Sequence, residues 1–237
     1  MSSQLFSENF GVLWVNSPPE NLSQKLTKRL WNEGVFRACT DGAANFIMPL
    51  VQNEHYLTPN LISGDFDSIT TKARNFFDSQ AEFVETSDPD YTDMTKSLKI
   101  IAGRINNKKL DMSKLIILGG LCGRFDHVLS SLHSLLQFSA CDAMIIDGYN
   151  LLTILPKGST HLNLTGRNAF STGMCGVIPF VQEKTMASTV GLKWNLHNTE
   201  LAFGKLISSS NEVVCDRITI TTTAPVVFTA ELKQGVM

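Results

Sequence analysis

Short apolar runs alternate with amphipathic stretches over the first 147 residues of the chain. Apolar runs of this length, bounded by turn residues, indicate strands. The predicted strands are residues 11–15, 35–40, 61–63, 82–86, 114–118 and 143–147. In segments 93–105 and 128–136 the apolar residues recur at three- and four-residue steps, which predicts helices, the first capped by Thr92. Strands that alternate with helices favour a parallel sheet covered by helices.

The pattern changes near Gly148. From there to Met237 we find no helical period, and short β-rich runs are separated by turn residues. The predicted strands are residues 151–155, 161–164, 177–180, 201–208 and 217–223. Such a series is typical of an antiparallel sandwich or barrel. The sequence therefore predicts two domains, residues 1–148 and 149–237.

Composition narrows the class of protein. The formal net charge of −2 gives no electrostatic reason to expect nucleic acid or an anionic membrane as a partner. The apolar runs are too short to span a bilayer, and the N-terminus lacks the pattern of a signal peptide. The five cysteines are scattered without metal-ligand spacing, as expected for free thiols in a reducing compartment. We therefore expect a cytoplasmic protein.

Aspartates gather where the predicted strands end and the helices begin. The carboxyl ends of parallel strands meet at one edge of a sheet, which is where ligands bind. Gathered carboxylates repel one another unless a cation lies among them, and hard oxygen ligands suit Mg²⁺, which in turn suits phosphate. A single such Asp is more often a turn or cap residue, but four consecutive turns carry acid. These acids are Asp41, Asp65, Asp67, Asp88, Asp90, Asp93 and Asp126.

A glycine-rich segment, residues 119–126, follows a predicted strand and opens a helix. Glycines allow backbone N–H groups to approach phosphate oxygens, and a helix N-terminus favours negative charge. Arg124 adds a permanently charged planar group that can grip phosphate. The segment is not a Walker A loop, because no Gly-Lys-Ser/Thr follows it. With Asp126 it predicts a site for the phosphates of a nucleotide.

Trp194 lies in the β-rich half in an unusual setting. A Trp in such a domain is more often part of the core than a ligand contact. Here Gly191, Lys193 and Asn195 accompany it, which is unusual around a core Trp. An exposed aromatic face would suit a flat cationic ligand through stacking and cation–π attraction.

At these residues the sequence resembles the thiamine pyrophosphokinase family, most closely its animal and fungal branch. The resemblance implies a Rossmann-like α/β domain that binds ATP and Mg²⁺, followed by an all-β sandwich domain that binds thiamine. It implies transfer of the pyrophosphate of ATP to the thiamine hydroxyl, giving thiamine diphosphate and AMP. The motifs that carry it, in order, are Asp41-Gly42-Ala43-Ala44-Asn45, Gly64-Asp65-Phe66-Asp67-Ser68, Asp90-Tyr91-Thr92-Asp93 with Lys96, Gly119-Gly120-Leu121-Cys122-Gly123-Arg124-Phe125-Asp126-His127, Gly191-Leu192-Lys193-Trp194-Asn195-Leu196 and Ser208-Ser209-Ser210-Asn211.

The resemblance also implies roles for single residues. The metal ligands would be Asp65, Asp67 and Asp93, with Asp41 and Asp126 as further catalytic acids. The nucleotide contacts would be Gly119, Gly120, Gly123, Arg124 and Asp126, and Arg124 would also act in catalysis. The thiamine contacts would be Ser188, Trp194 and Asn211. The resemblance further implies a homodimer in which each active site is shared between the two subunits.

Two positions depart from the family pattern. Ala43 stands where the family has a second Gly, and it would be strained if its φ were positive. Pro89 stands where the family usually has a long polar residue, so we expect no substrate contact from that side chain.

Two other functions fit parts of the sequence. Asp88, Asp90 and Thr92 spell the DxDxT nucleophile motif of haloacid-dehalogenase-like phosphatases, although about three predicted strands precede it. A non-enzymatic thiamine or nucleotide sensor would need a pocket but not the gathered acids. Release of AMP would distinguish the transferase from both.

Overall fold

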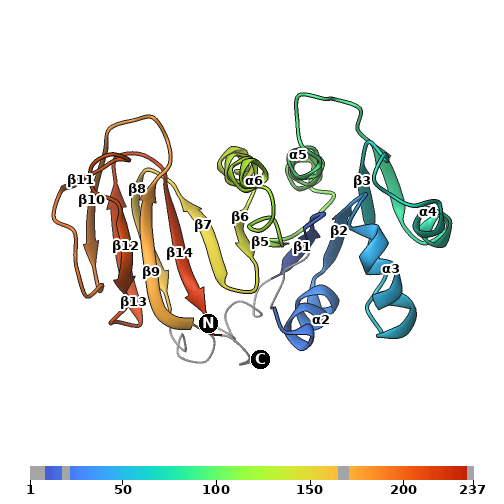
Figure 1. Cartoon of the computed structure of the whole chain (residues 1–237), viewed down its shortest axis with the longest axis horizontal. Helices are drawn as coiled ribbons and strands as arrows, with labels where there is room; N and C mark the ends of the chain where they lie inside the picture. Colours follow the sequence, from blue (N-terminus) through green and yellow to red (C-terminus); the bar gives the residue numbers. More distant parts are fainter. Residues whose placement is uncertain (1–8, 18–21, 165–170, 234–237) are drawn as a thin grey trace. The chain divides into compact units, whose positions relative to one another are not determined.

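The computed structural model describes residues 9–17, 22–164 and 171–233 (Figure 1). The chain divides into two compact units, the first ending at Gly148 and the second beginning at Tyr149. The first unit is an α/β structure and the second consists of antiparallel sheets. The predicted α/β class is thereby confirmed at this level.

The first unit contains a parallel sheet. Its strands lie in the order β6-β5-β1-β2-β3-β4, and every neighbouring pair is parallel. From β1 the chain progresses outward through β2 to β4 and then returns to the other side of β1 with β5, so the order reverses between β1 and β5. The bounds are β1 Phe10–Trp14, β2 Phe36–Thr40, β3 Leu61–Gly64, β4 Glu82–Glu85, β5 Lys114–Leu118 and β6 Asp142–Ile146.

Helices cover both faces of this sheet. Figure 1 shows α5 and α6 on one side of strands β1 to β3 and α2 and α3 on the other. Because of this cover, the whole of β1 is buried, as are four of the five residues of β5. Thr92 caps α5 as predicted, since its hydroxyl accepts from the N–H of Thr95 at 3.3 Å. The bounds are α2 Gln24–Glu33, α3 Ala44–Asn53, α4 Thr71–Phe77, α5 Asp93–Asn106 and α6 Phe125–Gln137.

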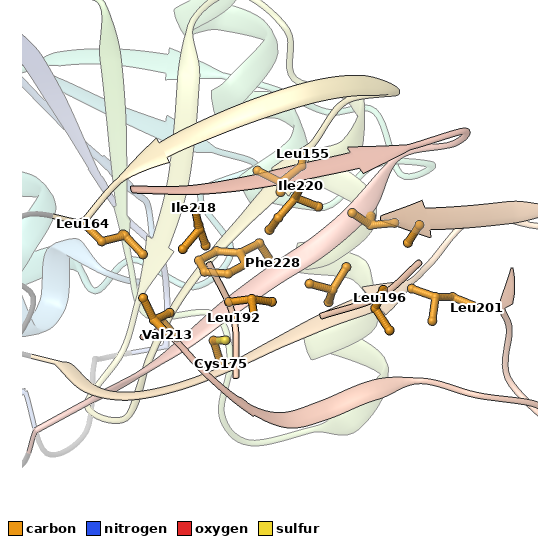
Figure 2. Packing of buried hydrophobic residues seen from close by; sticks show 14 residues of the cluster. Leu155, Leu164, Cys175, Leu192, Leu196, Leu201, Val213, Ile218, Ile220 and Phe228 are labelled. Atoms are coloured by element: carbon orange, nitrogen blue, oxygen red, sulfur yellow. The ribbon is translucent and has the colours of Figure 1, made fainter. Parts of the chain in front are cut away.

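The second unit is built from two layers of antiparallel strands. One layer has the order β12-β9-β14-β7 and the other β11-β10-β13-β8. Apolar side chains from both layers meet in one core around Phe228, shown in Figure 2. The bounds are β7 Asn150–Leu155, β8 Gly158–Asn163, β9 Ser171–Pro179, β10 Thr185–Val190, β11 Thr199–Leu201, β12 Ser208–Glu212, β13 Arg217–Thr222 and β14 Val226–Leu232.

One predicted strand was wrong. Residues 201–208 do not form a single strand, because β11 ends at Leu201 and β12 begins at Ser208 in the other layer. Gly204 lies between them with φ +82°, which turns the chain. None of the helices in the described residues is both long and apolar enough to cross a membrane.

Candidate functional site

Three aspartates meet at the carboxyl edge of the parallel sheet. Asp41 follows β2, Asp65 follows β3, and Asp93 is the first residue of α5. One carboxylate oxygen of each lies within 4.8 Å of the others. The close approach depends on Gly64, whose Cβ, if present, would lie 2.6 Å from Asp41 Cγ. Three of the seven acids that the sequence places at this edge therefore lie together in the structure.

Asp41 is the buried member of this acid group. Its residue is 0% exposed, and its carboxylate accepts hydrogen bonds from the N–H groups of Gly42 (2.7 Å) and Ser68 (3.3 Å). Burial raises the pKa of Asp41, and the negative charges of Asp93 and Asp65 raise it further, while the two hydrogen bonds lower it. Two N–H groups thus bind the carboxylate of Asp41, and a nearby cation would stabilise its charge.

Lys96 supplies positive charge to the acid group, although we had not predicted it as a site residue. Its Nζ lies 2.9 Å from Asp93 Oδ1 and 3.9 Å from Asp65 Oδ2, and it donates to the carbonyl of Thr86 at 3.0 Å. The side chain is 7% exposed. Its spacing of three residues from Asp93 on α5 is the signal in the sequence, because residues so spaced lie on one helical face.

The acid group fits a divalent cation. Its donors are carboxylate oxygens, which Mg²⁺ prefers, and three of them converge within the span of one ion. Burial is the main cause of the raised pKa of Asp41, and the charges of Asp93 and Asp65 add to it. A single lysine against three acids leaves the group negative at neutral pH.

Asp67 is a predicted metal ligand that does not join the acid group. Its carboxylate accepts from the hydroxyl of Ser68 at 2.7 Å, and its N–H donates to Asp65 Oδ1 at 3.3 Å. Between the two acids, Phe66 has φ +64°, a left-handed conformation that is rare for a bulky residue and marks local strain. This turn directs Asp65 toward Asp41, and Asp67 is exposed.

Asn45 fixes the segment that carries these acids. Its amide nitrogen donates to the carbonyl of Ser68 at 2.8 Å. Its amide oxygen accepts from both the N–H and the hydroxyl of Thr70, each at 2.8 Å. Ala43, in the same motif, has φ −66°, so the strain that a positive φ would have caused is absent.

Replacing Asp41 with Asn is expected to stabilise the metal-free protein at neutral pH by about 1 kcal/mol, because a buried charge among like charges is removed. The pKa of Asp41 is higher in the folded than in the unfolded protein, so its stabilising contribution is present at low pH and disappears as the pH rises through the folded value. Urea unfolding in EDTA at pH 7.5 and near pH 4 measures the difference. The gain should shrink at the lower pH, and a less stable variant at pH 7.5 would contradict the argument.

The glycine-rich loop connects β5 with α6. Gly119, Gly120 and Gly123 all have positive φ, from +84° to +92°, so the predicted backbone freedom is used. Gly119 also allows close packing, because a Cβ there would lie 1.6 Å from the carbonyl oxygen of Ser17, just after β1. The loop therefore lies where the strand order reverses, between β1 and β5.

Arg124 and Asp126 form an ion pair at the start of α6. Arg124 Nε and Nη2 donate to the two carboxylate oxygens of Asp126 at 3.1 and 2.5 Å. The pair raises the pKa of Arg124 and lowers that of Asp126, mainly through these hydrogen bonds. Both side chains are exposed, so the guanidinium keeps further N–H donors for a ligand.

The DxDxT segment does not have the setting of a phosphatase nucleophile. Asp88 and Asp90 lie between β4 and α5, and both are exposed. Asp88 accepts a turn hydrogen bond from the N–H of Asp90 at 3.0 Å. The preceding strand, β4, is the fourth strand of the chain and lies at the edge of the parallel sheet, whereas the phosphatase motif follows the first strand of its fold.

In the second unit, Trp194 projects from a turn anchored in the core. Leu192 and Leu196, on either side of it, are buried in the cluster of Figure 2, at 2% and 9% exposed. Trp194 itself is 56% exposed, which excludes the reading of a core Trp. Two buried leucines thus hold an exposed indole at the surface of this unit.

Asn211 fixes the backbone of Trp194. Its side-chain oxygen accepts from the N–H of Trp194 at 3.2 Å, and its nitrogen donates to the carbonyl of Trp194 at 2.8 Å. The two residues line a hollow of about 310 Å³ together with the polar segment 208–210. Ser188 is not among the residues that line this hollow. Its hydroxyl accepts a hydrogen bond from the N–H of Asn198 at 2.9 Å.

Both parts of the chain match known protein families. Residues 27–146 match the family described as thiamin pyrophosphokinase, catalytic domain, and residues 160–227 match its vitamin B1 binding domain. Thiamin pyrophosphokinase 1 of Caenorhabditis elegans is 36% identical over 226 residues, covering 94% of this chain and 90% of the relative. Thiamine pyrophosphokinase 1 of Arabidopsis thaliana is 32% identical over 222 residues, covering 89% and 83%.

Solved structures share the fold. The thiamin pyrophosphokinase from Candida albicans superposes with a TM-score of 0.83 at 21% identity, over 96% of this chain and 90% of that one. The yeast enzyme gives 0.84 at 23% identity, over 97% and 88%. With both domain families matched in order, and a relative more than one-third identical along nearly all of its length, this chain belongs to the thiamine pyrophosphokinase family.

Proposed function

We propose that this chain transfers the pyrophosphate of ATP to the hydroxyl of thiamine, releasing AMP and thiamine diphosphate. Membership of the family supports the reaction. The observation that carries the proposal is the convergence of Asp41, Asp65 and Asp93 at the carboxyl edge of a parallel sheet. A sensor of thiamine or nucleotide would not need these acids, and the setting of Asp88 does not favour a phosphatase.

The first predicted domain, residues 1–148, is the proposed domain for ATP and Mg²⁺. Its strand order reverses between β1 and β5, as in Rossmann-like folds, and nucleotides bind such sheets outside the carboxyl ends at this point. The glycine-rich loop follows β5 and therefore lies beside the point of reversal. This position supports a Rossmann-like description and a nucleotide site at Gly119, Gly120 and Gly123.

The acid group would hold Mg²⁺ through Asp65 and Asp93, with Asp41 beside them and Asp67 within the same turn. When bound, the ion neutralises charge on the phosphates. Lys96 keeps Asp93 and Asp65 oriented by its contacts with both. Asn45 keeps the turn that carries Asp65 in place through its three hydrogen bonds.

The loop and Arg124 would hold the polyphosphate. The backbone N–H groups of Gly120, of Gly123 and of the start of α6 can approach phosphate oxygens closely, whereas the N–H of Gly119 already donates to the carbonyl of Ile146 at 3.1 Å. The pair between Arg124 and Asp126 presents the guanidinium at the same place. The thiamine hydroxyl oxygen would then attack the β-phosphorus, the bond to the bridging oxygen of AMP would break, and the hydroxyl proton would pass to a carboxylate.

The second predicted domain, residues 149–237, is the proposed thiamine-binding domain. Its exposed indole, Trp194, and the polar hollow beside it suit a flat, cationic heteroaromatic ligand. Asn211 would act by holding Trp194, and Ser188 would lie near the site without lining the hollow.

We further propose a cytoplasmic homodimer with active sites shared between subunits. The scattered spacing of the five cysteines accords with a reducing compartment.

Product analysis tests the reaction. The pure protein is incubated with ATP, Mg²⁺ and thiamine, and the nucleotides and thiamine species are separated. We expect equal amounts of AMP and thiamine diphosphate, both lost on addition of EDTA. ADP with thiamine monophosphate would instead indicate a simple kinase. Inorganic phosphate through an aspartyl-phosphate would indicate a phosphatase, and binding without any product would indicate a sensor.

A further inference from the structure

The indole of Trp194 is fixed by a contact other than those of its backbone. Asn211 holds the peptide groups of Trp194 but does not restrain the ring. The ammonium of Lys193 lies over the ring, 4.9 Å from its centroid, at cation–π distance. An exposed aromatic side chain without such a contact would have to be ordered when a ligand binds, which costs affinity.

Glu212 in turn fixes Lys193. Lys193 Nζ donates to Glu212 Oε2 at 2.8 Å, and the N–H of Lys193 donates to the carbonyl of Glu212, also at 2.8 Å. Glu212 is anchored in the sheet, where it pairs with Met174 of β9, and its own N–H donates to Asn211 Oδ1 at 2.8 Å. A chain of contacts thus runs from a paired strand through a carboxylate and an ammonium to the indole.

Neither Lys193 nor Glu212 lines the hollow beside Trp194. The two side chains are 52% and 38% exposed, so as an ion pair alone they would add little stability. Glu212 instead holds the ammonium of Lys193, and that ammonium lies over the ring. Assuming the thiamine site proposed above, we infer that Lys193, held by Glu212, is a positioning residue that keeps the Trp194 indole oriented toward the hollow before the substrate arrives.

Calorimetric titration of the full chain with thiamine tests this inference. Lys193→Met keeps the length of the side chain and removes its charge, and we expect it to raise the Kd for thiamine about fivefold. Glu212→Gln should act in the same direction and add little to Lys193→Met. Lys193→Arg should bind within about twofold of the parent, because a guanidinium can both stack on the indole and pair with Glu212.

The matched control is Lys205→Met. Lys205 pairs with Glu200 at 2.7 Å in the same unit and with similar exposure. Lys205→Met therefore removes a surface ion pair that has no contact with Trp194. We expect the control to leave the Kd unchanged. In steady-state kinetics, Lys193→Met should raise KM for thiamine without changing KM for ATP or kcat.

Acrylamide quenching of the ligand-free protein gives a second readout. Trp14 and Trp31 are buried, so the quencher reports on Trp194, and Lys193→Met should change its accessibility. In a Trp194→Ala background, Lys193→Met should have no further effect on thiamine binding. If Lys193→Met has the parent's Kd for thiamine and the parent's quenching while Trp194→Ala binds weakly, the inference about Lys193 is overturned and the proposed thiamine site is not. Parental binding by Trp194→Ala would overturn the proposed thiamine site as well.

Discussion

Replacing Asp65 with Asn is expected to lower kcat by on the order of 10²- to 10³-fold while leaving the protein folded. The substitution keeps the shape of the side chain and removes one charge from the acid group. Asp65 is 44% exposed, so its loss should change the free energy of unfolding by less than about 1 kcal/mol. AMP formation at saturating substrates measures the rate, and calorimetric titration with Mg²⁺ measures metal binding.

Two further variants sharpen this experiment. Asp111→Asn removes an exposed acid of the same unit that lies outside the acid group, and it should be fully active. Asp67→Asn tests the member of the predicted metal set that the structure leaves outside that group. An equal loss of Mg²⁺ affinity in Asp65→Asn and Asp67→Asn would support two ligands from this turn. Near-parental turnover of a folded Asp65→Asn protein would remove Asp65 from the metal role.

Replacing Gly119 with Ala is expected to destabilise the protein by about 3 kcal/mol and to raise KM for ATP more than tenfold. Two effects add at this residue. Its φ of +84° is unfavourable for any residue with a Cβ, and that Cβ would lie 1.6 Å from the carbonyl oxygen of Ser17. Because the obstacle is backbone, β1, β5 or the loop between β5 and α6 must shift. Denaturant unfolding measures the stability and initial rates measure KM.

Gly123→Ala is the matched control in the same loop. Its φ is also +84°, but nothing lies within 4 Å of the position of a Cβ. It therefore carries the backbone strain without the collision, and we expect a loss of about 1 kcal/mol. Equal stabilities of the two alanine variants would show that the collision with Ser17 is relieved without cost.

Some elements were predictable from local pattern alone. The strand predicted at residues 114–118 is β5 to the residue, because its apolar run is buried between helices on both faces. Strand β10 was missed because its inward residues are Thr185, Ala187 and Thr189, which give no hydrophobic signal. Ala187 is buried in the core where the two layers of this unit meet, and the pairing partner β13 is distant in sequence. Burial of that kind depends on tertiary structure.

The site divides in the same way. The place of the acids followed from the rule that parallel strands end at one edge, and Asp41, Asp65 and Asp93 do lie together there. Which acids face one another did not follow, because it depends on the positive φ of Phe66. Lys96 was visible as part of a motif, but its burial beside Asp93 required the packing of α5 on the sheet.

Within five residues, the turn around Trp194 contains positions constrained by packing of the core and positions free of that constraint. Leu192 and Leu196 are part of the core, where a change of side-chain volume would destabilise the fold. Lys193 and Trp194, between them, lie at the surface, where a substitution leaves that core intact, whereas Asn195 accepts a hydrogen bond from the N–H of Leu192 at 3.1 Å and holds the turn. Such a segment can drift or be redesigned at its exposed positions without loss of the scaffold. Recognition by this domain can therefore evolve faster than its fold.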